Sequence, residues 1–138
     1  MKVKKALVVD DNQNNLLLEK DLLELAGFEV FSAENALDGI QIAREEKLDV
    51  IIMDVRLPDM LGTEAARVLR NDIIPCGVPI IFVTASLMAD GMDEVKTIAN
   101  SGVIGKPINT RTFARDIIEL IKKIPGENHE RESDNISC

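Results

Sequence analysis

Short apolar runs alternate along the chain with longer stretches in which apolar residues recur at helical spacing. The clearest run, residues 48–54, reads Leu-Asp-Val-Ile-Ile-Met-Asp and ends at a carboxylate. A short run of apolar and β-branched residues is typical of a strand buried on both faces, as in a parallel sheet covered by helices. Further strands are predicted at residues 5–10, 28–32, 78–84 and 103–104.

The stretches that follow these runs predict five helices. Asn12 is a candidate N-cap for the first helix, and Gly27 is expected to end it. The second helix opens at Glu34 or Asn35. The remaining helices are predicted at residues 62–72, about 88–100 and 110–123. Because Gly91 interrupts the fourth helix and most of its other residues are polar, we expect that helix to be mobile.

The apolar positions of the first two helices predict which sides face the core. The first helix is expected to carry a broad apolar stripe formed by Leu16, Leu17, Leu18, Leu22, Leu23 and Leu25. The inward residues of the second helix are expected to be Ala36, Leu37, Ile40, Ile42 and Ala43.

Strands that alternate with helices predict parallel βαβ units with right-handed crossovers, and therefore a three-layer α/β domain.

Composition and charge narrow the class of protein. The length of 138 residues and the 46% hydrophobic content suit one domain, predicted at residues 1–124, and the polar segment 125–138 is expected to be disordered. The net charge of −8 argues against a direct nucleic-acid partner. No apolar run approaches the roughly 20 residues of a membrane span, and no signal peptide is recognisable, so a cytoplasmic protein is expected. Cys76 and Cys138 show no metal-ligand or disulfide spacing.

Polar residues with chemical potential follow several predicted strands. Asp10 and Asp11 end the first strand, Asp54 the third and Thr84 the fourth, and Lys106 follows the fifth. The carboxyl ends of parallel strands meet at one edge of a sheet, so these side chains are expected to converge. Crowded carboxylates repel one another and need a cation, and an all-oxygen site with few protein ligands suits Mg²⁺. Lys106 and Thr84 would contact a phosphoryl group, which leaves Asp54 as the nucleophile of an acyl-phosphate mechanism.

Each of these residues taken singly also has an ordinary structural interpretation. An Asp at a strand end is more often a turn or helix cap than a nucleophile. Asp10 and Asp11 could serve as an N-cap and a first-turn charge, Thr84 as a strand residue and Lys106 as a solvated loop charge. Their joint occurrence at strand ends favours the phosphoacceptor interpretation.

With these motifs, residues 4 to about 123 resemble the receiver domain of two-component response regulators, a flavodoxin-like family with strand order 2-1-3-4-5. The resemblance implies that Asp54 is the phosphoacceptor. It also implies that Asp10, Asp11, Asp54 and the main-chain carbonyl of Arg56 hold Mg²⁺. The motifs that carry it are Val-Val-Asp10-Asp11, Met-Asp54-Val-Arg-Leu-Pro58 with Gly62 downstream, Val-Thr84-Ala85 and Lys106-Pro107.

Further expectations come from the same resemblance. The phosphoryl donor would be a histidine kinase or a histidine phosphotransfer protein, and the peptide before Pro107 would be cis. The chain is similar to stand-alone regulators, which dock on a protein target or pass phosphate along a relay. It departs from the family at Val103, where an aromatic switch residue is usual. Ser86 and Arg56 occupy positions that influence how water reaches the aspartyl phosphate.

Two other classes of function fit parts of the pattern. A Mg²⁺-dependent phosphatase with an aspartyl nucleophile commonly has a second acid two residues later, where this chain has Arg56. A flavodoxin-like binder of a flavin or nucleotide would need a phosphate-binding loop after the first strand. No Gly-rich loop is found there, and the chain has no Trp or Tyr for stacking.

Overall fold

The structure is a computed structural model that describes residues 3–71, 73–75, 77–85 and 92–123. These residues form one five-stranded sheet in the order β2-β1-β3-β4-β5, and every pair of neighbouring strands is parallel. The predicted flavodoxin-like architecture is therefore confirmed. The strands are β1 (Lys5–Val9), β2 (Glu29–Ala33), β3 (Val50–Asp54), β4 (Ile80–Thr84) and β5 (Ser101–Gly105). The helices are α1 (Gln13–Leu25), α2 (Ala36–Glu45), α3 (Gly62–Arg70), α4 (Met92–Val95) and α5 (Phe113–Lys123).

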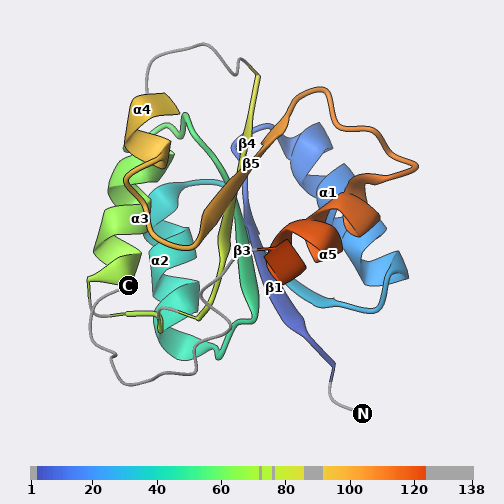
Figure 1. The fold of residues 1–138 in the computed structure, drawn as a ribbon, viewed down its shortest axis with the longest axis horizontal. Helices are drawn as coiled ribbons and strands as arrows, with labels where there is room; N and C mark the ends of the chain where they lie inside the picture. The colour runs from blue at the N-terminus through green and yellow to red at the C-terminus, as the bar shows by residue number, and fades with distance from the viewer. Residues whose placement is uncertain (1–2, 72, 76, 86–91, 124–138) are drawn as a thin grey trace.

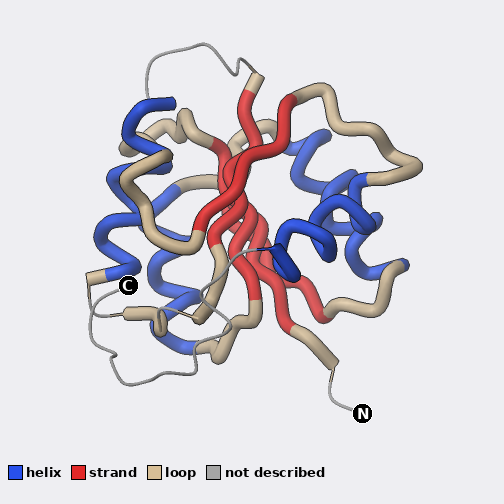
Figure 2. Tube along the Cα trace, in the orientation of Figure 1, coloured by secondary structure: helices blue, strands red, loops and turns tan. Residues whose placement is uncertain are grey.

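The helices cover the sheet on both sides and make the expected three layers. In Figure 1, α1 and α5 lie on one side of the sheet and α2, α3 and α4 on the other, with the strands between them, as Figure 2 shows in red. Side chains alternate along each strand, so each face of the sheet has its own apolar cluster. Leu7 and Val9 of β1 join the α2–α3 side, whereas Ala6 and Val8 join the α1–α5 side.

The prediction that the leucines of α1 form one buried stripe was wrong. Leu16 and Leu23 are buried, but Leu17 is 58% exposed and Leu25 is 86% exposed. Adjacent positions of a helix point about 100° apart, so a helix that packs on one sheet face cannot bury them all. The described part of α1 buries Glu19 beside the two inward leucines instead.

The first turn of α2 is held by two acceptor side chains. The Asn35 side chain accepts a hydrogen bond from the Asp38 N–H at 2.8 Å, which makes Asn35 the N-cap. The Asp59 carboxylate, from the loop after β3, accepts from the N–H groups of Ala36 and Leu37, each at 2.9 Å. Leu37 is 60% exposed, so its predicted inward position was wrong. The loop after β3 is thus fixed to the N-terminus of α2.

The fourth helix is shorter than predicted. It ends at Val95, and the residues that follow form turns rather than helix. Asn100 has a left-handed backbone with φ 62°, which does not continue a helix. The Arg70 guanidinium of α3 donates to the carbonyls of Ala99 and Asn100 at 3.0 and 3.2 Å, which ties the turns after α4 to α3.

Some predicted features lie outside the described residues, namely Gly91, Ser86 and the polar segment 125–138. Within the described part of the chain, none of the helices has the length and apolar character of a membrane span.

Candidate functional site

Four of the residues predicted to carry chemistry lie at the carboxyl edge of the sheet. Asp54 is the last residue of β3 and Thr84 the last of β4, while Asp10 directly follows β1 and Lys106 directly follows β5. The pairing of Val9 with Met53 brings Asp10 level with Asp54. Asp54 pairs with Val83, and Val83 with Ile104, so Thr84 and Lys106 follow one and two residues beyond that level. Pairing of strands that are distant in the sequence therefore assembles the site.

Lys106 joins two of the acids directly. Its Nζ atom donates to Oδ2 of Asp54 at 2.9 Å and to Oδ2 of Asp10 at 3.0 Å. The side chains are little exposed, at 14% for Lys106, 13% for Asp54 and 1% for Asp10. Burial by itself lowers the pKa of the Lys106 ammonium, but the hydrogen bonds and charges of the two carboxylates outweigh it and raise the pKa above its usual value. Lys106 is therefore a charged donor at neutral pH.

The acids at this edge fit a divalent cation. Carboxylate oxygens of Asp10, Asp11 and Asp54 all lie within 4.8 Å of one another, and this is the group of possible metal ligands found among the described residues. Among the described residues, the Lys106 ammonium is the cation paired with these acids, and it balances only part of their charge. A hard, all-oxygen donor set with excess negative charge suits Mg²⁺ better than a softer transition metal.

Backbone N–H groups orient the same carboxylates. The N–H of Asn12 donates to Oδ1 of Asp10 at 2.9 Å, and that of Arg56 donates to Oδ1 of Asp54 at 3.2 Å. Asn12 is also the N-cap of α1, as predicted, since its side chain accepts from the Asn15 N–H at 3.0 Å. The Arg56 main chain therefore lies beside Asp54, and the use of its carbonyl as a metal ligand stays a prediction.

Thr84 and the segment after β5 border the site. Thr84 is buried, with 6% of its surface exposed, and its carbonyl accepts the Lys106 N–H at 2.7 Å. The peptide between Lys106 and Pro107 is cis, as expected. Val103 is half-buried in β5, where it pairs with Phe82 of β4. No aromatic side chain occupies the usual switch position.

A glycine allows the loop after Asp54 to fold back on the strand end. The Gly62 N–H donates to the Val55 carbonyl at 2.6 Å at the start of α3. A Cβ atom built at Gly62 would collide with the carbonyl oxygen of Asp54. Because only glycine has no side chain, this close approach requires Gly62 and helps to fix the backbone of Asp54.

Glu19 is a residue of the site that the sequence reasoning missed. It is 1% exposed and lies on the inward face of α1. Burial, and after it the charge of Asp10, raise the pKa of Glu19 from 4.5 to about 8. The charge of Lys106 acts to lower this pKa, whereas the charge of Asp54 and a hydrogen bond with Asp10 act to raise it. The signal in the sequence was a carboxylate three residues after Leu16, on the side of the helix where apolar residues belong.

Comparisons with known proteins agree with this geometry. The profile of the response regulator receiver domain matches residues 6–118. The polar-differentiation response regulator DivK of Brucella anthropi is 34% identical over 124 residues, which are 90% of this chain and 98% of DivK. The DivK protein of Brucella ovis is 33% identical over the same shares.

Solved structures give the same result. The chemotaxis response regulator CheY4 of Vibrio cholerae has a TM-score of 0.80 and 28% identity, over 86% of this chain and 99% of that one. A receiver domain protein of Methanospirillum hungatei also has a TM-score of 0.80 and 28% identity, over 92% and 100% of the two chains. The chain therefore belongs to the family of response regulator receiver domains, the signal-receiving modules of two-component systems.

Proposed function

We propose that Asp54 accepts a phosphoryl group from the phosphohistidine of a histidine kinase or a histidine phosphotransfer protein. The observation that carries this proposal is the contact of the Lys106 ammonium with Asp54 and Asp10 at the carboxyl edge of the sheet. Receiver domains of response regulators interact with proteins of these two kinds. The proposed receiver unit comprises residues 1–124, and the proposed compartment is the cytoplasm, where such donors present their phosphohistidine.

The transfer needs a nucleophile and positive charge around the phosphoryl oxygens. A carboxylate oxygen of Asp54 forms a bond to phosphorus while the phosphorus–nitrogen bond of the donor breaks. The imidazole leaves with the electron pair of that bond and takes up a proton. Lys106 exchanges a carboxylate partner for a phosphoryl oxygen, and the Thr84 hydroxyl donates a hydrogen bond to another.

The proposed cofactor of this reaction is Mg²⁺. Receiver domains bind Mg²⁺ at an acidic cluster, and the ligands proposed in this chain are Asp10, Asp11, Asp54 and the main-chain carbonyl of Arg56. The bound ion would supply positive charge at the phosphoryl oxygens and relieve the repulsion between the three carboxylates.

The proposed output is a shift between two conformations of the face formed by α4, β5 and α5. Thr84 ends β4 and Lys106 follows β5, so new contacts with a phosphoryl group would pull on the strands to which these helices are joined. The recognised target is proposed to be a protein, since the net charge of −8 disfavours nucleic acid.

Mass spectrometry after incubation with acetyl phosphate and Mg²⁺ tests the proposal. The wild type is expected to gain one phosphoryl group, and Asp54→Asn none. Asp21→Asn is a matched control, because Asp21 is an exposed residue of α1 away from the site. Equal modification of Asp54→Asn and wild type would contradict the assignment. Return of the phosphoryl group to a histidine phosphotransfer protein would indicate a relay, and its absence a docking switch.

A further inference from the structure

Arg70, the last residue of α3, is a half-buried cation that pairs with no acid in the described part of the chain. Its guanidinium donates instead to three main-chain carbonyls, those of Pro75 at 3.0 Å, Ala99 at 3.0 Å and Asn100 at 3.2 Å. Removal of a guanidinium from water costs free energy unless its N–H groups find acceptors, and these carbonyls supply them. Burial lowers the pKa of Arg70 to about 10, so the group stays charged at neutral pH. Arg70 therefore joins the segments that lead into β4 and β5.

The turn of residues 96–100, between α4 and β5, is tied to α3 by a second arginine as well. Arg67 donates to Oγ1 of Thr97 at 2.9 Å, and this hydroxyl donates to the Glu94 carbonyl of α4 at 2.6 Å. Oγ of Ser101, the first residue of β5, donates to the carbonyl of Ile98 at 2.8 Å. In Figure 1, α4 and the segment that follows it lie beside α3. The C-terminal end of α4 is thus attached to α3 through turn 96–100.

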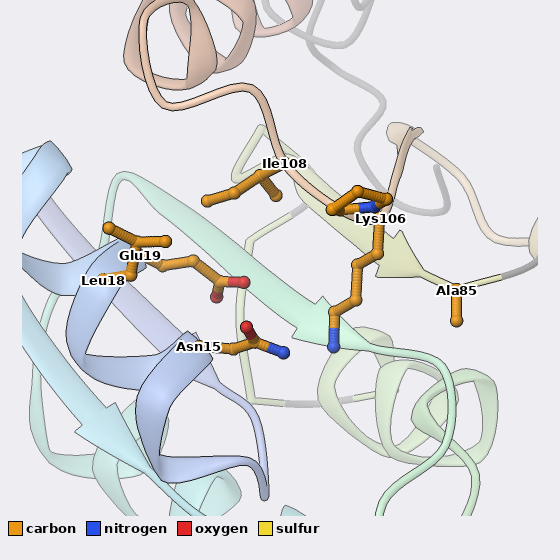
Figure 3. Close-up of a pocket in the computed structure, with 7 residues that line it drawn as sticks. Asn15, Leu18, Glu19, Ala85, Lys106 and Ile108 are labelled. Atoms are coloured by element: carbon orange, nitrogen blue, oxygen red, sulfur yellow. The ribbon is translucent and has the colours of Figure 1, made fainter.

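This attachment lies at the opposite end of β4 and β5 from the phosphoacceptor site. Asn100 directly precedes β5, and its carbonyl also accepts the N–H of Ile80, the first residue of β4, at 3.1 Å. At the other end of the two strands, the carbonyl of Thr84 accepts the Lys106 N–H at 2.7 Å. Figure 3 shows Ala85 and Lys106, the residues that follow β4 and β5, together at that end. The two strands therefore connect the arginine contacts with the site.

The attached turn changes what a displacement at the site can do. Under the proposed function, contacts with a phosphoryl group draw Thr84 and Lys106 toward it, and with them the carboxyl ends of β4 and β5. Turns open at little cost in free energy when few contacts hold them, and a free turn would absorb the displacement. The bonds from Arg67 and Arg70 keep turn 96–100 on α3 instead. The displacement then becomes a rotation of α4 about the turn.

We propose that Arg67 and Arg70 are positioning residues of the output response, which hold turn 96–100 on α3 as the pivot about which α4 rotates when the site is phosphorylated. This inference rests on the proposed function and adds to it the fixed end of the moving face. A lysine cannot replace Arg70, because an ammonium lacks the planar fork of donors that reaches carbonyls in two segments. Loss of the pivot leaves phosphorylation intact and weakens the response of α4.

NMR spectroscopy of the full chain with Mg²⁺ and beryllofluoride, a mimic of a bound phosphoryl group, tests the proposal. In the wild type, the amide signals of Thr84, Lys106 and residues 92–95 are expected to shift. In Arg70→Lys the shifts of Thr84 and Lys106 should persist, whereas those of residues 92–95 should fall by at least about twofold. Arg44→Met removes an exposed arginine of α2 and should respond as the wild type does. Shifts of residues 92–95 in Arg70→Lys as large as in the wild type, or larger, would overturn the inference.

A merely structural role of Arg70 would lower the stability in urea and leave the response of α4 unchanged. Circular dichroism verifies that each variant is folded. If Arg70→Lys does not fold, Arg67→Met applies the same test, because Arg67 is exposed and its loss removes the single contact with Thr97. Arg67→Met should also weaken the shifts of residues 92–95, and undiminished shifts would contradict its part in the pivot.

Failure of the proposed function would look different. A wild type in which beryllofluoride with Mg²⁺ shifts neither Thr84 nor Lys106, and in which acetyl phosphate labels no residue, would remove the function on which the pivot depends. Site shifts that are present, with an equal response of α4 in the wild type and in both arginine variants, would remove the pivot alone.

Discussion

The Nζ atom of Lys106 lies 2.9 Å from Oδ2 of Asp54, although 52 positions separate the two residues in the chain. The same ammonium reaches Asp10 across 96 positions. Both acids are also proposed cation ligands, so the lysine and a divalent cation bind overlapping carboxylates. The lysine and the cation therefore compete for the same carboxylates, so removal of the lysine should favour binding of the cation.

Replacement of Lys106 by Met should strengthen Mg²⁺ binding and weaken phosphorylation. One charge-assisted hydrogen bond is worth about 1.5–3 kcal/mol, so release of the acids should raise Mg²⁺ affinity by about tenfold or more. Without a divalent cation the variant should unfold at lower urea concentration than wild type, because buried Asp10 loses its positive partner. Calorimetry and acetyl phosphate labelling measure the first two effects. Unchanged Mg²⁺ affinity would show that Lys106 and the cation do not compete.

Substitution of Gly62 by Ala should destabilise the fold and slow the labelling of Asp54. The new methyl group would collide with the Asp54 carbonyl, and overpacking of this kind costs about 1–3 kcal/mol. Gly77→Ala is the matched control, since a Cβ atom at Gly77 has no atom within 4 Å. Urea unfolding, followed by circular dichroism because the chain has no Trp or Tyr, should separate the two variants. Similar stabilities of the two variants would show that the loop after β3 can move to accommodate a methyl group at Gly62.

Replacement of Glu19 by Gln should stabilise the protein at alkaline pH in the presence of a chelator. The pKa of Glu19 is about 8 in the folded protein and 4.5 as its ordinary value. Between these values the unfolded chain has lost a proton that the folded chain retains, so stability falls as pH rises. The expected gain for the variant is on the order of a few kcal/mol near pH 8 and small near pH 5. Parallel stability profiles of variant and wild type between these two pH values would contradict the raised pKa.

Asp59→Ala should loosen the attachment of the loop after β3 to α2 at a cost of about 1 kcal/mol, as for a lost helix cap. Desolvation acts to raise the pKa of the exposed Asp59 carboxyl group, but the N–H groups of Ala36, Leu37, Asp59 and Met60 together lower it. The stabilisation is therefore complete above the ordinary pKa of the unfolded chain and is lost as pH falls through the lower folded value. Hydrogen exchange at Ala36 and Leu37 should accelerate at neutral pH. Exchange as slow as in wild type would show that Asn35 alone secures the helix start.

The arrangement of strands and site residues could be predicted because the sequence encodes it locally. Apolar runs that end in Asp10 and Asp54 indicate buried parallel strands, and parallel strands bring their carboxyl ends together whatever lies between them. The convergence of Lys106 on both acids follows from the same rule.

The parts that could not be predicted depend on contacts between elements. Three consecutive leucines do not reveal which one faces the sheet, and Leu17 lies outside while Leu16 lies inside. The turns after α4 are held by Arg70 of α3, some thirty residues away in the chain, and a local pattern does not reveal such a contact. Glu19 passed unnoticed because a single acid in an amphipathic helix is usually assigned to the solvent side.

The pairing of β1 with β3 has a consequence for when the protein can respond to a signal. Side chains alternate across a strand, so a slip of β3 by one residue would carry Asp54 to the opposite face of the sheet from its present partners. A partly folded chain therefore has neither the lysine contact nor the acid group, and under the proposed function it could not accept a phosphoryl group. An ion that binds the assembled acids would stabilise only the chain whose strands pair in the correct register. By mass action, binding of the ion would therefore raise the fraction of correctly folded protein.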